Sequence, residues 1–267
     1  MRTALRSLIV LLASVAIASA VACTSSGDGT GALLPEDASG GVYLALGDSF
    51  AAGSGASDAA ATSYAGLVGA ALRDRYGETL EARNLADGGA TTQSLIDGQL
   101  HAATEALRAG DVRLVTITIG GNDLNELQSS PDTAACLVDV ASPACPVAEL
   151  LAGTEERLDT ILSELRAAGP ETVMVMELYP NLFSGTGHVF EEAAEDAFTM
   201  LNEVIARVTE RYDVVLADPR APFVGGGREL THLLDATPDA HPNDAGHRAI
   251  AEAFLAALGL STGRGTD

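Results

Sequence analysis

The sequence predicts an α/β domain in which a parallel sheet is covered by helices on both faces. Short apolar runs that suit strands alternate along the chain with longer segments that suit helices. Two of the runs, residues 112–119 and 172–177, are mostly apolar or β-branched, as is typical of parallel strands buried on both sides. A chain of 267 residues is also long enough for one substantial domain with a full core. We therefore expect one domain over residues 41–260.

The order of the expected elements supports a parallel sheet. The strands are expected at residues 42–46, 80–85, 112–119, 172–177 and 213–217. The helices are expected at about residues 63–76, 92–108, 148–168, 189–210 and 244–258. Each internal helix separates two strands, and this is the connection that neighbouring parallel strands require. Asn243 or Asp244 supplies a capping side chain for the last helix. The connection over residues 123–147 is longer than usual, and long connections are often functional.

Composition excludes several classes of function. Hydrophobic residues make up 47% of the chain but aromatic residues only 4%, so the core should consist mostly of Ala, Leu and Val. All 15 basic residues are arginine, which excludes chemistry through a Schiff-base lysine and a phosphate-loop lysine. The net charge of −22 disfavours nucleic acid and anionic membrane surfaces as partners. We interpret this acidity as a contribution to solubility.

The first 22 residues are typical of a signal peptide. Arg2 and Arg6 give a positive start, and the apolar run 8–18 that follows is too short for a comfortable membrane span. Residues 23–40 are rich in glycine and serine and are expected to form a flexible tether, and residues 261–267 a short tail. The protein is therefore expected to be exported.

The segment Ala20-Val21-Ala22-Cys23 resembles the lipobox of bacterial lipoproteins, in which the cysteine is lipidated and becomes the mature N-terminus. Ala20 departs from the leucine usual at that position. The alternative is ordinary cleavage near Ala20 or Ala22, which leaves Cys23 as a free thiol. In the first case the lipid anchor is the protein's contact with the membrane.

Two further cysteines, Cys136 and Cys145, remain as a pair. In an oxidising compartment they are expected to form a disulfide that closes a small loop and contributes on the order of 2–3 kcal/mol. Two cysteines are too few for a structural zinc site, and His101, His188 and His232 lack the spacing of metal ligands. No Gly-x-Gly-x-x-Gly follows a strand. We therefore expect neither a metal nor a cofactor.

Polar and glycine-rich segments follow several of the expected strands. Gly47-Asp48-Ser49-Phe50 follows the first, a block containing Gly88-Gly89 the second, and Gly120-Gly121-Asn122-Asp123 the third. A further block, His241-Pro242-Asn243, opens the last helix. In open α/β sheets, ligands bind outside the carboxyl ends of the strands. Each block alone also fits a turn, a helix cap or a solvated loop, but their occurrence together favours one distributed site.

The chemistry of these residue types suits ester cleavage, which needs a nucleophile, a base and donors for the developing oxyanion. Ser49 supplies a hydroxyl, and His241 an imidazole, a side chain that ordinarily titrates near a pH of about 6.5. The backbone N–H groups of Ser49 and Gly89 and the side-chain amide of Asn122 are the candidate oxyanion donors. His247 lies six residues after His241, within the last helix, and is expected to be a packing or surface residue.

These four blocks resemble the signature blocks of the SGNH, or GDSL-type, hydrolases over roughly residues 42–258. The resemblance implies a flavodoxin-like three-layer α/β/α fold with a five-stranded parallel sheet. It also implies hydrolysis of esters or thioesters without metal or cofactor. By this resemblance Ser49 is the nucleophile and first oxyanion donor, Gly89 and Asn122 are the other two donors, and His241 is the general base.

One position departs from the family pattern. The family usually has an aspartate three residues before the catalytic histidine, where this chain has Pro238. Asp239, two residues before His241, is the nearest carboxylate and our expected third catalytic residue. Asp235 or a backbone carbonyl remains as an alternative, because the role of this group is to orient the ring and stabilise the imidazolium.

The apolar residues of two segments are expected to wall the site and to contact an acyl chain. One is the cysteine loop with Leu137, Val138 and Val140, and the other is the segment 178–185. The alternative is that these residues only pack the loops against the domain. We expect a monomeric, exported serine esterase or lipase that acts on a small-molecule or lipid ester. A carbohydrate deacetylase or a thioesterase of the same family, and a non-catalytic ligand-binding lipoprotein, are the alternatives.

Overall fold

The computed structural model describes residues 33–34, 39–129, 133–140 and 142–260, which belong to one compact unit. The expected signal peptide, Cys23, most of the tether and the C-terminal tail lie outside the described residues, as does the side chain of Val138.

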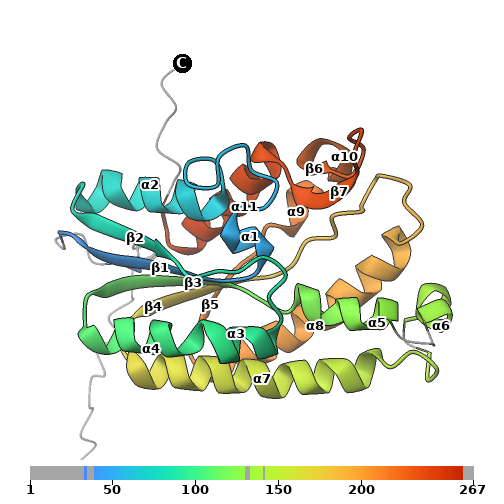
Figure 1. Ribbon diagram of the computed structural model, residues 1–267, viewed down its shortest axis with the longest axis horizontal. Coiled ribbons are helices and arrows are strands. Elements are labelled where there is room, and N and C mark those ends of the chain that lie inside the picture. The colour runs from blue at the N-terminus through green and yellow to red at the C-terminus, as the bar shows by residue number, and fades with distance from the viewer. Residues whose placement is uncertain (1–32, 35–38, 130–132, 141, 261–267) are drawn as a thin grey trace, which may run out of the picture. The chain divides into compact units, whose positions relative to one another are not determined.

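The sheet has five strands in the order β2-β1-β3-β4-β5, and every neighbouring pair is parallel (Figure 1). The strands are β1 (Gly41–Gly47), β2 (Leu80–Asn84), β3 (Val112–Thr118), β4 (Val173–Glu177) and β5 (Val215–Ala217). All five lie where the sequence predicts strands. The α/β class and the three-layer arrangement expected from the resemblance are therefore confirmed.

Helices cover both faces of the sheet, as Figure 1 shows. One face carries α2 (Tyr64–Tyr76) and α11 (Asp244–Ala257), which pack against each other. The other face carries four helices, α3 (Thr92–Gly98), α4 (Leu100–Ala109), α7 (Val147–Ala168) and α8 (Glu191–Arg211). The single helix expected at residues 92–108 is in fact two, α3 and α4. They meet at Gln99, whose side chain hydrogen-bonds the backbone of Gly47.

Several short elements were not predicted. They are α1 (Ser49–Ala52), η1 (Gly121–Asn125), α5 (Glu126–Ser129), α6 (Thr133–Val138), α9 (Arg220–Phe223), α10 (Gly227–Leu230), β6 (Thr231–His232) and β7 (Asp239–Pro242). Helices of four to six residues and strands of two to four hold too little of a hydrophobic period to be recognised in a sequence. Most of them lie at the carboxyl ends of the strands, so they are the elements that shape the site.

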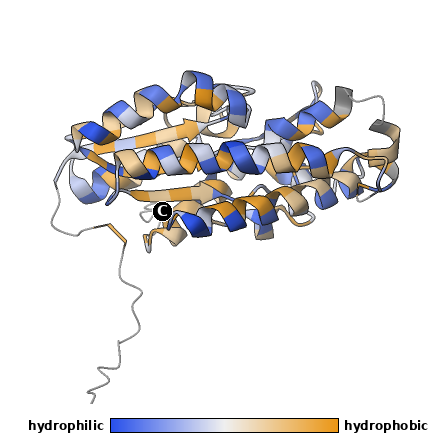
Figure 2. Ribbon diagram, turned by 90° about the horizontal axis from the view of Figure 1, so that it is seen from below, coloured by the Kyte–Doolittle hydropathy of each residue, from blue (hydrophilic) through white to orange (hydrophobic). Residues whose placement is uncertain are grey.

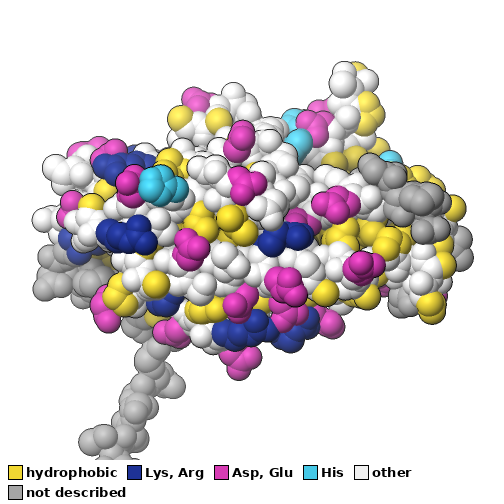
Figure 3. All heavy atoms as spheres, turned by 60° about the horizontal axis from the view of Figure 1, so that its bottom comes forward, with side chains coloured by type: hydrophobic (Ala, Val, Ile, Leu, Met, Phe, Trp, Pro, Cys, Tyr) yellow, Lys and Arg dark blue, Asp and Glu magenta, His cyan; other side chains and the backbone are white. Residues whose placement is uncertain are grey.

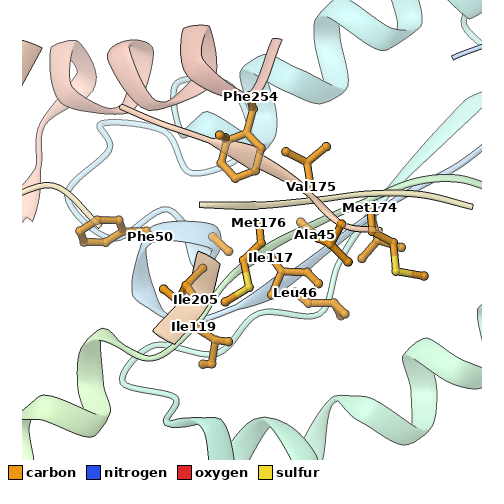
Figure 4. Packing of buried hydrophobic residues seen from close by; sticks show 14 of the residues in the cluster. Ala45, Leu46, Phe50, Ile117, Ile119, Met174, Val175, Met176, Ile205 and Phe254 are labelled. Atoms are coloured by element: carbon orange, nitrogen blue, oxygen red, sulfur yellow. The ribbon is translucent and has the colours of Figure 1, made fainter. Parts of the chain in front are cut away.

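The core is built from aliphatic side chains between the sheet and its helices. Figure 4 shows Ile117 and Met176 of the sheet beside Ile205 of α8, and all three are fully buried. On the opposite face Tyr64 of α2 stacks on Phe254 of α11, with ring centroids 4.8 Å apart. Figure 2 shows the strands coloured mainly as hydrophobic and the helices striped, as expected for a sheet covered on both sides.

Ion pairs hold the exposed surfaces of α7 and α8 together. Arg207 and Arg211 of α8 contact Glu155 of α7, and Arg211 also contacts Asp159. Figure 3 shows basic side chains lying against acidic ones on this side of the molecule. Within the described residues, no helix is both long enough and apolar enough to span a bilayer.

The strand order fixes where a ligand site is expected. The chain runs from β1 outward to β2 and then returns past β1 to β3, so the direction of winding reverses between β1 and β3. Ligands of doubly wound sheets bind in the crevice at such a reversal, outside the carboxyl ends of the strands. Ser49 follows β1 and Asn122 follows β3, so both lie at this crevice.

Candidate active site

Ser49 is the first residue of α1, directly after the sharp turn that ends β1. Gly47 has a φ of +129°, and a Cβ at this position would lie 1.9 Å from the carbonyl oxygen of Thr118. Only glycine allows this close approach of two backbones. Asp48 caps the helix by accepting a hydrogen bond from the N–H of Phe50 at 3.0 Å. The Ser49 side chain is thereby held at a helix N-terminus beside the crevice.

The side chain of Gln99 holds the turn at Gly47 in place. Its side-chain oxygen accepts from the N–H of Gly47, and its side-chain nitrogen donates to the carbonyl of the same residue, both at 2.8 Å. Gln99 is buried, and this pair of bonds satisfies both of its polar atoms. No sequence pattern indicates a contact between residues this far apart, so this support was not foreseen.

Asp48 is buried beneath Ser49 and receives three donors. The hydroxyl of Tyr179 donates to Oδ2, while the N–H of Phe50 and the hydroxyl of Thr118 donate to Oδ1. Burial raises the pKa of Asp48 to about 6, and the hydrogen bonds, led by that of Tyr179, limit the rise. The Tyr179 ring lies between those of Phe50 and Phe198, so it connects the turn that carries Ser49 to α8.

The side-chain amide of Asn122 has a defined orientation. Its Oδ1 accepts from Nδ2 of Asn125, and its Nδ2 donates to the carbonyl of Ala90, each at 3.0 Å. An Nδ2 group has two hydrogens, so one remains for another acceptor. Gly89, directly before Ala90, has a φ of +79° and is exposed. Asn122 is thus joined directly to the segment that carries Gly89.

An ion pair between buried Asp123 and partly buried Arg157 fixes the segment after Asn122. Asp123 is buried and accepts from the N–H of Thr92 at 2.9 Å and from Arg157 of α7 at 3.0 Å. Arg157 also donates to the hydroxyl of Thr92. These contacts join η1 to the start of α3 and so hold the two candidate oxyanion blocks together. The roles of Arg157 and Thr92 were not predicted: Arg157 lies outside the four blocks, and Thr92, at the end of the second, was assigned no role.

His241 lies on β7, which pairs with β6 as a two-stranded antiparallel ribbon. Its Nδ1 is 2.6 Å from Oδ1 of Asp239, and the same oxygen accepts from the His241 backbone N–H at 3.1 Å. Side chains two residues apart in a strand point to the same side. The extended backbone therefore explains how a carboxylate two residues before the histidine reaches its ring.

Electrostatics favour the charged form of Asp239. Its partial burial opposes ionisation, but the backbone N–H and the ring of His241 together lower its pKa below the ordinary value. Asp235 contacts a different histidine, with its Oδ2 2.6 Å from Nδ1 of His232. Of the two carboxylates considered from the sequence, the structure brings Asp239 and not Asp235 to His241.

His247 is a packing residue and is fully buried. Its Nε2 lies 2.9 Å from the carbonyl oxygen of Ser54, and its Nδ1 accepts from the N–H of Tyr64. Burial is the main cause of its lowered pKa, so the neutral ring is favoured.

Ser49, Asn122 and His241 line one cavity of about 330 Å³. Its apolar walls come from η1 and α5, the cysteine loop, the segment after β4, and α8. Its other lining residues are Asp48, Phe50, Gly121, Leu124, Asn125, Leu127, Cys136, Leu137, Val140, Tyr179, Leu182, Phe183, Phe190, Ala193, Ala194, Ala197, Phe198 and Ala240. Gly89 and Asp239 are not among them, so of the five expected catalytic and oxyanion residues the structure brings three to the cavity wall.

Cys136 and Cys145 are joined by a disulfide, with their Cα atoms 4.8 Å apart. Because Cys136 lines the cavity, the bridge fixes one wall of the site. Among the described residues, no group of three or more His, Cys, Asp or Glu side chains is arranged to hold a metal ion.

Comparison with known proteins identifies one family and several solved structures with a similar fold. Residues 45–249 match the family model of the GDSL-like lipase/acylhydrolase family. An extracellular lipase from Streptomyces rimosus is similar in structure, with a TM-score of 0.60 and 23% identity over 82% of this chain and 98% of that one. No curated protein matches the chain at a significant level.

Two further solved structures have the same fold. A phospholipase A1 from Streptomyces albidoflavus has a TM-score of 0.58 and 24% identity over 82% of this chain and 98% of that one. An acetylxylan esterase from Geobacillus stearothermophilus has a TM-score of 0.58 and 21% identity over 87% of this chain and 100% of that one. The match to the family model spans most of the chain, and the fold agrees with it.

Proposed function

Since the chain belongs to the GDSL-like lipase/acylhydrolase family and is a carboxylic ester hydrolase, we propose that it works through Ser49 as nucleophile and His241 as base. The observation that carries this proposal is that Ser49 and His241, far apart in the sequence, line one cavity. Asp239 holds the ring of His241 through Nδ1, which leaves Nε2 as the nitrogen that accepts the proton of Ser49.

The proposed reaction has two steps. In the first, Oγ of Ser49 attacks the ester carbon while Nε2 of His241 takes the hydroxyl proton, and that proton then goes to the departing alcohol. In the second, water attacks the acyl carbon while Nε2 of His241 takes a proton from it. The bond between that carbon and Oγ of Ser49 then breaks, His241 returns the proton to Oγ, and the carboxylic acid is released. The oxyanion of each step accepts hydrogen bonds from the N–H of Ser49, the N–H of Gly89 and the amide of Asn122.

The apolar cavity supports an acyl chain as the group next to the scissile ester. Leu182, Phe183 and Phe190 form one wall, and the small side chains of Ala193, Ala194 and Ala197 leave room along α8. A cavity of about 330 Å³ lies at the lower end of the range for ligand sites. We therefore assign it to an acyl chain of several carbons rather than to acetyl alone.

The direct test combines turnover with covalent labelling of the full chain. We expect hydrolysis of p-nitrophenyl esters and stoichiometric reaction with a fluorophosphonate, with the mass increase located on the peptide that contains Ser49. Labelling of a different serine, or hydrolysis that persists after complete labelling, would contradict the serine mechanism. Absence of both reactions would favour a ligand-binding lipoprotein.

Substitution of Ala194 tests the acyl cavity. We expect Ala194→Phe to lower kcat/KM for p-nitrophenyl octanoate at least about tenfold while the value for the acetate ester changes little. The physical reason is that each methylene excluded from an apolar site costs about 0.8 kcal/mol. Ala167→Phe, at an exposed position of α7, is the matched control. A wild-type preference for acetyl esters would instead favour a carbohydrate deacetylase, the reaction class of the Geobacillus structure.

Export and anchoring are the remaining parts of the proposal. The Streptomyces rimosus structure is that of an extracellular lipase, which supports export. We propose that residues 1–22 are removed and that Cys23 carries the lipid. Metabolic labelling with a fatty acid, lost in Cys23→Ser, would support the anchor, whereas an unlabelled wild-type protein would exclude it.

A further inference from the structure

The loop after the nucleophile helix lies directly against the strand that carries His241. Gly55 has a φ of +86°, and a Cβ there would lie 2.3 Å from the carbonyl oxygen of Pro242 and 3.0 Å from Cβ of His241. Figure 1 shows the loop between α1 and α2 beside α11 and the β6–β7 ribbon. The spacing of the proposed nucleophile and base therefore depends on how firmly this loop and this ribbon are joined.

Three side chains, two on α11 and one on the ribbon, hold this loop in place. His247 of α11 lies 2.9 Å from the carbonyl of Ser54, and Asp244 accepts from the backbone and hydroxyl of Ser57 at 2.7 and 2.6 Å. The third is His232 of β6, whose Nε2 lies 2.8 Å from the carbonyl oxygen of Gly55. His247 and Asp244 make their contacts in their ordinary neutral and charged forms.

His232 differs from the other two because both of its ring nitrogens face acceptors. Nε2 faces the carbonyl oxygen of Gly55, and Nδ1 lies 2.6 Å from Oδ2 of Asp235. Neither a carbonyl nor a carboxylate can donate, and a neutral imidazole has only one N–H. Both hydrogen bonds form together only when the ring carries its second proton.

The charges around His232 agree with this requirement. The hydrogen bond that the ring donates to Asp235 is the main cause that raises the pKa of His232, followed by the bond to the Gly55 carbonyl, and Asp239, its pairing partner on β7, adds to the effect. Partial burial acts in the opposite direction. The titratable groups of like sign nearby are His247 on α11, whose neutral form is favoured by burial, and His241 on the paired strand β7.

We propose that protonated His232 is a positioning residue. It joins the loop between α1 and α2 to the β6–β7 ribbon that carries His241, so that the spacing of Ser49 and His241 depends on pH. The proposal rests on the proposed function of those two residues. His232 itself does not line the cavity, and both of its nitrogens are engaged, so it is not an alternative base. As the pH rises through the raised pKa of His232, the ring loses one of its two hydrogen bonds and the loop loosens.

Steady-state kinetics of the full chain test this inference. Wild type, His232→Gln and Asp235→Asn are compared over about pH 5.5 to 9.5, with kcat and KM determined separately. We expect kcat of the wild type to fall on the alkaline side and this fall to move to lower pH in Asp235→Asn. His232→Gln keeps a donor but has no titrating group at this position. Its kcat should be about tenfold lower at pH 6 with little change in KM, and the decrease in kcat that we attribute to deprotonation of His232 should be absent.

His101→Gln is the matched control, because His101 is an exposed histidine with a carboxylate neighbour, Glu105, on the remote helix α4. Its profile should equal that of the wild type. An alkaline limb that is unchanged in both His232→Gln and Asp235→Asn would overturn the inference. Equal loss of activity at every pH in Asp235→Asn would also overturn it, because that result indicates a merely structural role.

Two measurements separate this inference from the proposed function. In an NMR titration, the ring resonance that disappears in His232→Gln should titrate above the ordinary value of about 6.5, and a value at or below it would overturn the inference without any activity assay. Thermal unfolding gives the second readout. A raised pKa in the folded state adds stability that is fully present below the ordinary pKa and is lost as the pH rises through the raised value. His232→Gln should remove this part of the pH dependence.

Discussion

Ser49→Ala is expected to lower kcat for a p-nitrophenyl ester by at least about three orders of magnitude, with the fold intact. Removing the hydroxyl removes the atom that we propose as the nucleophile, and residual turnover would then depend on the proposed oxyanion donors and on binding. Alanine fits the position without strain because it is the first residue of a short helix.

Kinetics and thermal unfolding on the same samples check this expectation. Ser163→Ala, which removes a hydroxyl from the exposed side of α7, is the matched control and should behave as the wild type. Residual kcat within tenfold of the wild-type value, at an unchanged unfolding temperature, would show that another group attacks the ester.

Asp239→Asn is expected to have the second largest effect, a loss of about two to four orders of magnitude in kcat. An asparagine side chain cannot stabilise the imidazolium that forms when His241 takes the proton, and it favours the wrong tautomer of the ring. We expect a loss near the lower end of this range because Asp239 is half-exposed. Solvent weakens the interaction between its charge and the imidazolium, so less stabilisation is lost with the charge.

The matched control is Asp159→Asn, which removes an exposed carboxylate that contacts Arg211. It should leave kcat unchanged. If Asp239→Asn retained more than about a third of the activity, a group other than this carboxylate would hold His241, and Asp239 would then be only a surface partner of the ring.

Most of the fold could be predicted from the sequence because its main elements are long and strongly patterned. The apolar run over residues 112–119 corresponds to β3, and the segment 148–168 corresponds to α7 within one residue. The helix expected at residues 92–108 failed at Gln99, because a side-chain contact with Gly47 decides the local geometry there. Such tertiary contacts leave no period in the sequence.

The site was predictable to a different extent. Ser49, Asn122 and His241 lie in recognisable blocks, and the structure brings all three to one cavity. The partner of His241 could not be decided from the number of residues that separate it from each aspartate, because the relative direction of two side chains depends on whether the backbone between them is a turn or a strand. Only the extended backbone of β7 places Asp239 and His241 on the same side.

The stacked pair of Tyr64 and Phe254 has a consequence for folding kinetics. This contact joins α2, near the start of the domain, to α11, at its end, and α11 directly follows the strand that carries His241. Closing so long a loop is slow compared with forming local structure, so such contacts form late. During refolding, recovery of hydrolytic activity should therefore lag behind the far-ultraviolet circular dichroism of the sheet and helices. The recovery of hydrolytic activity would then measure the rate of the last folding step.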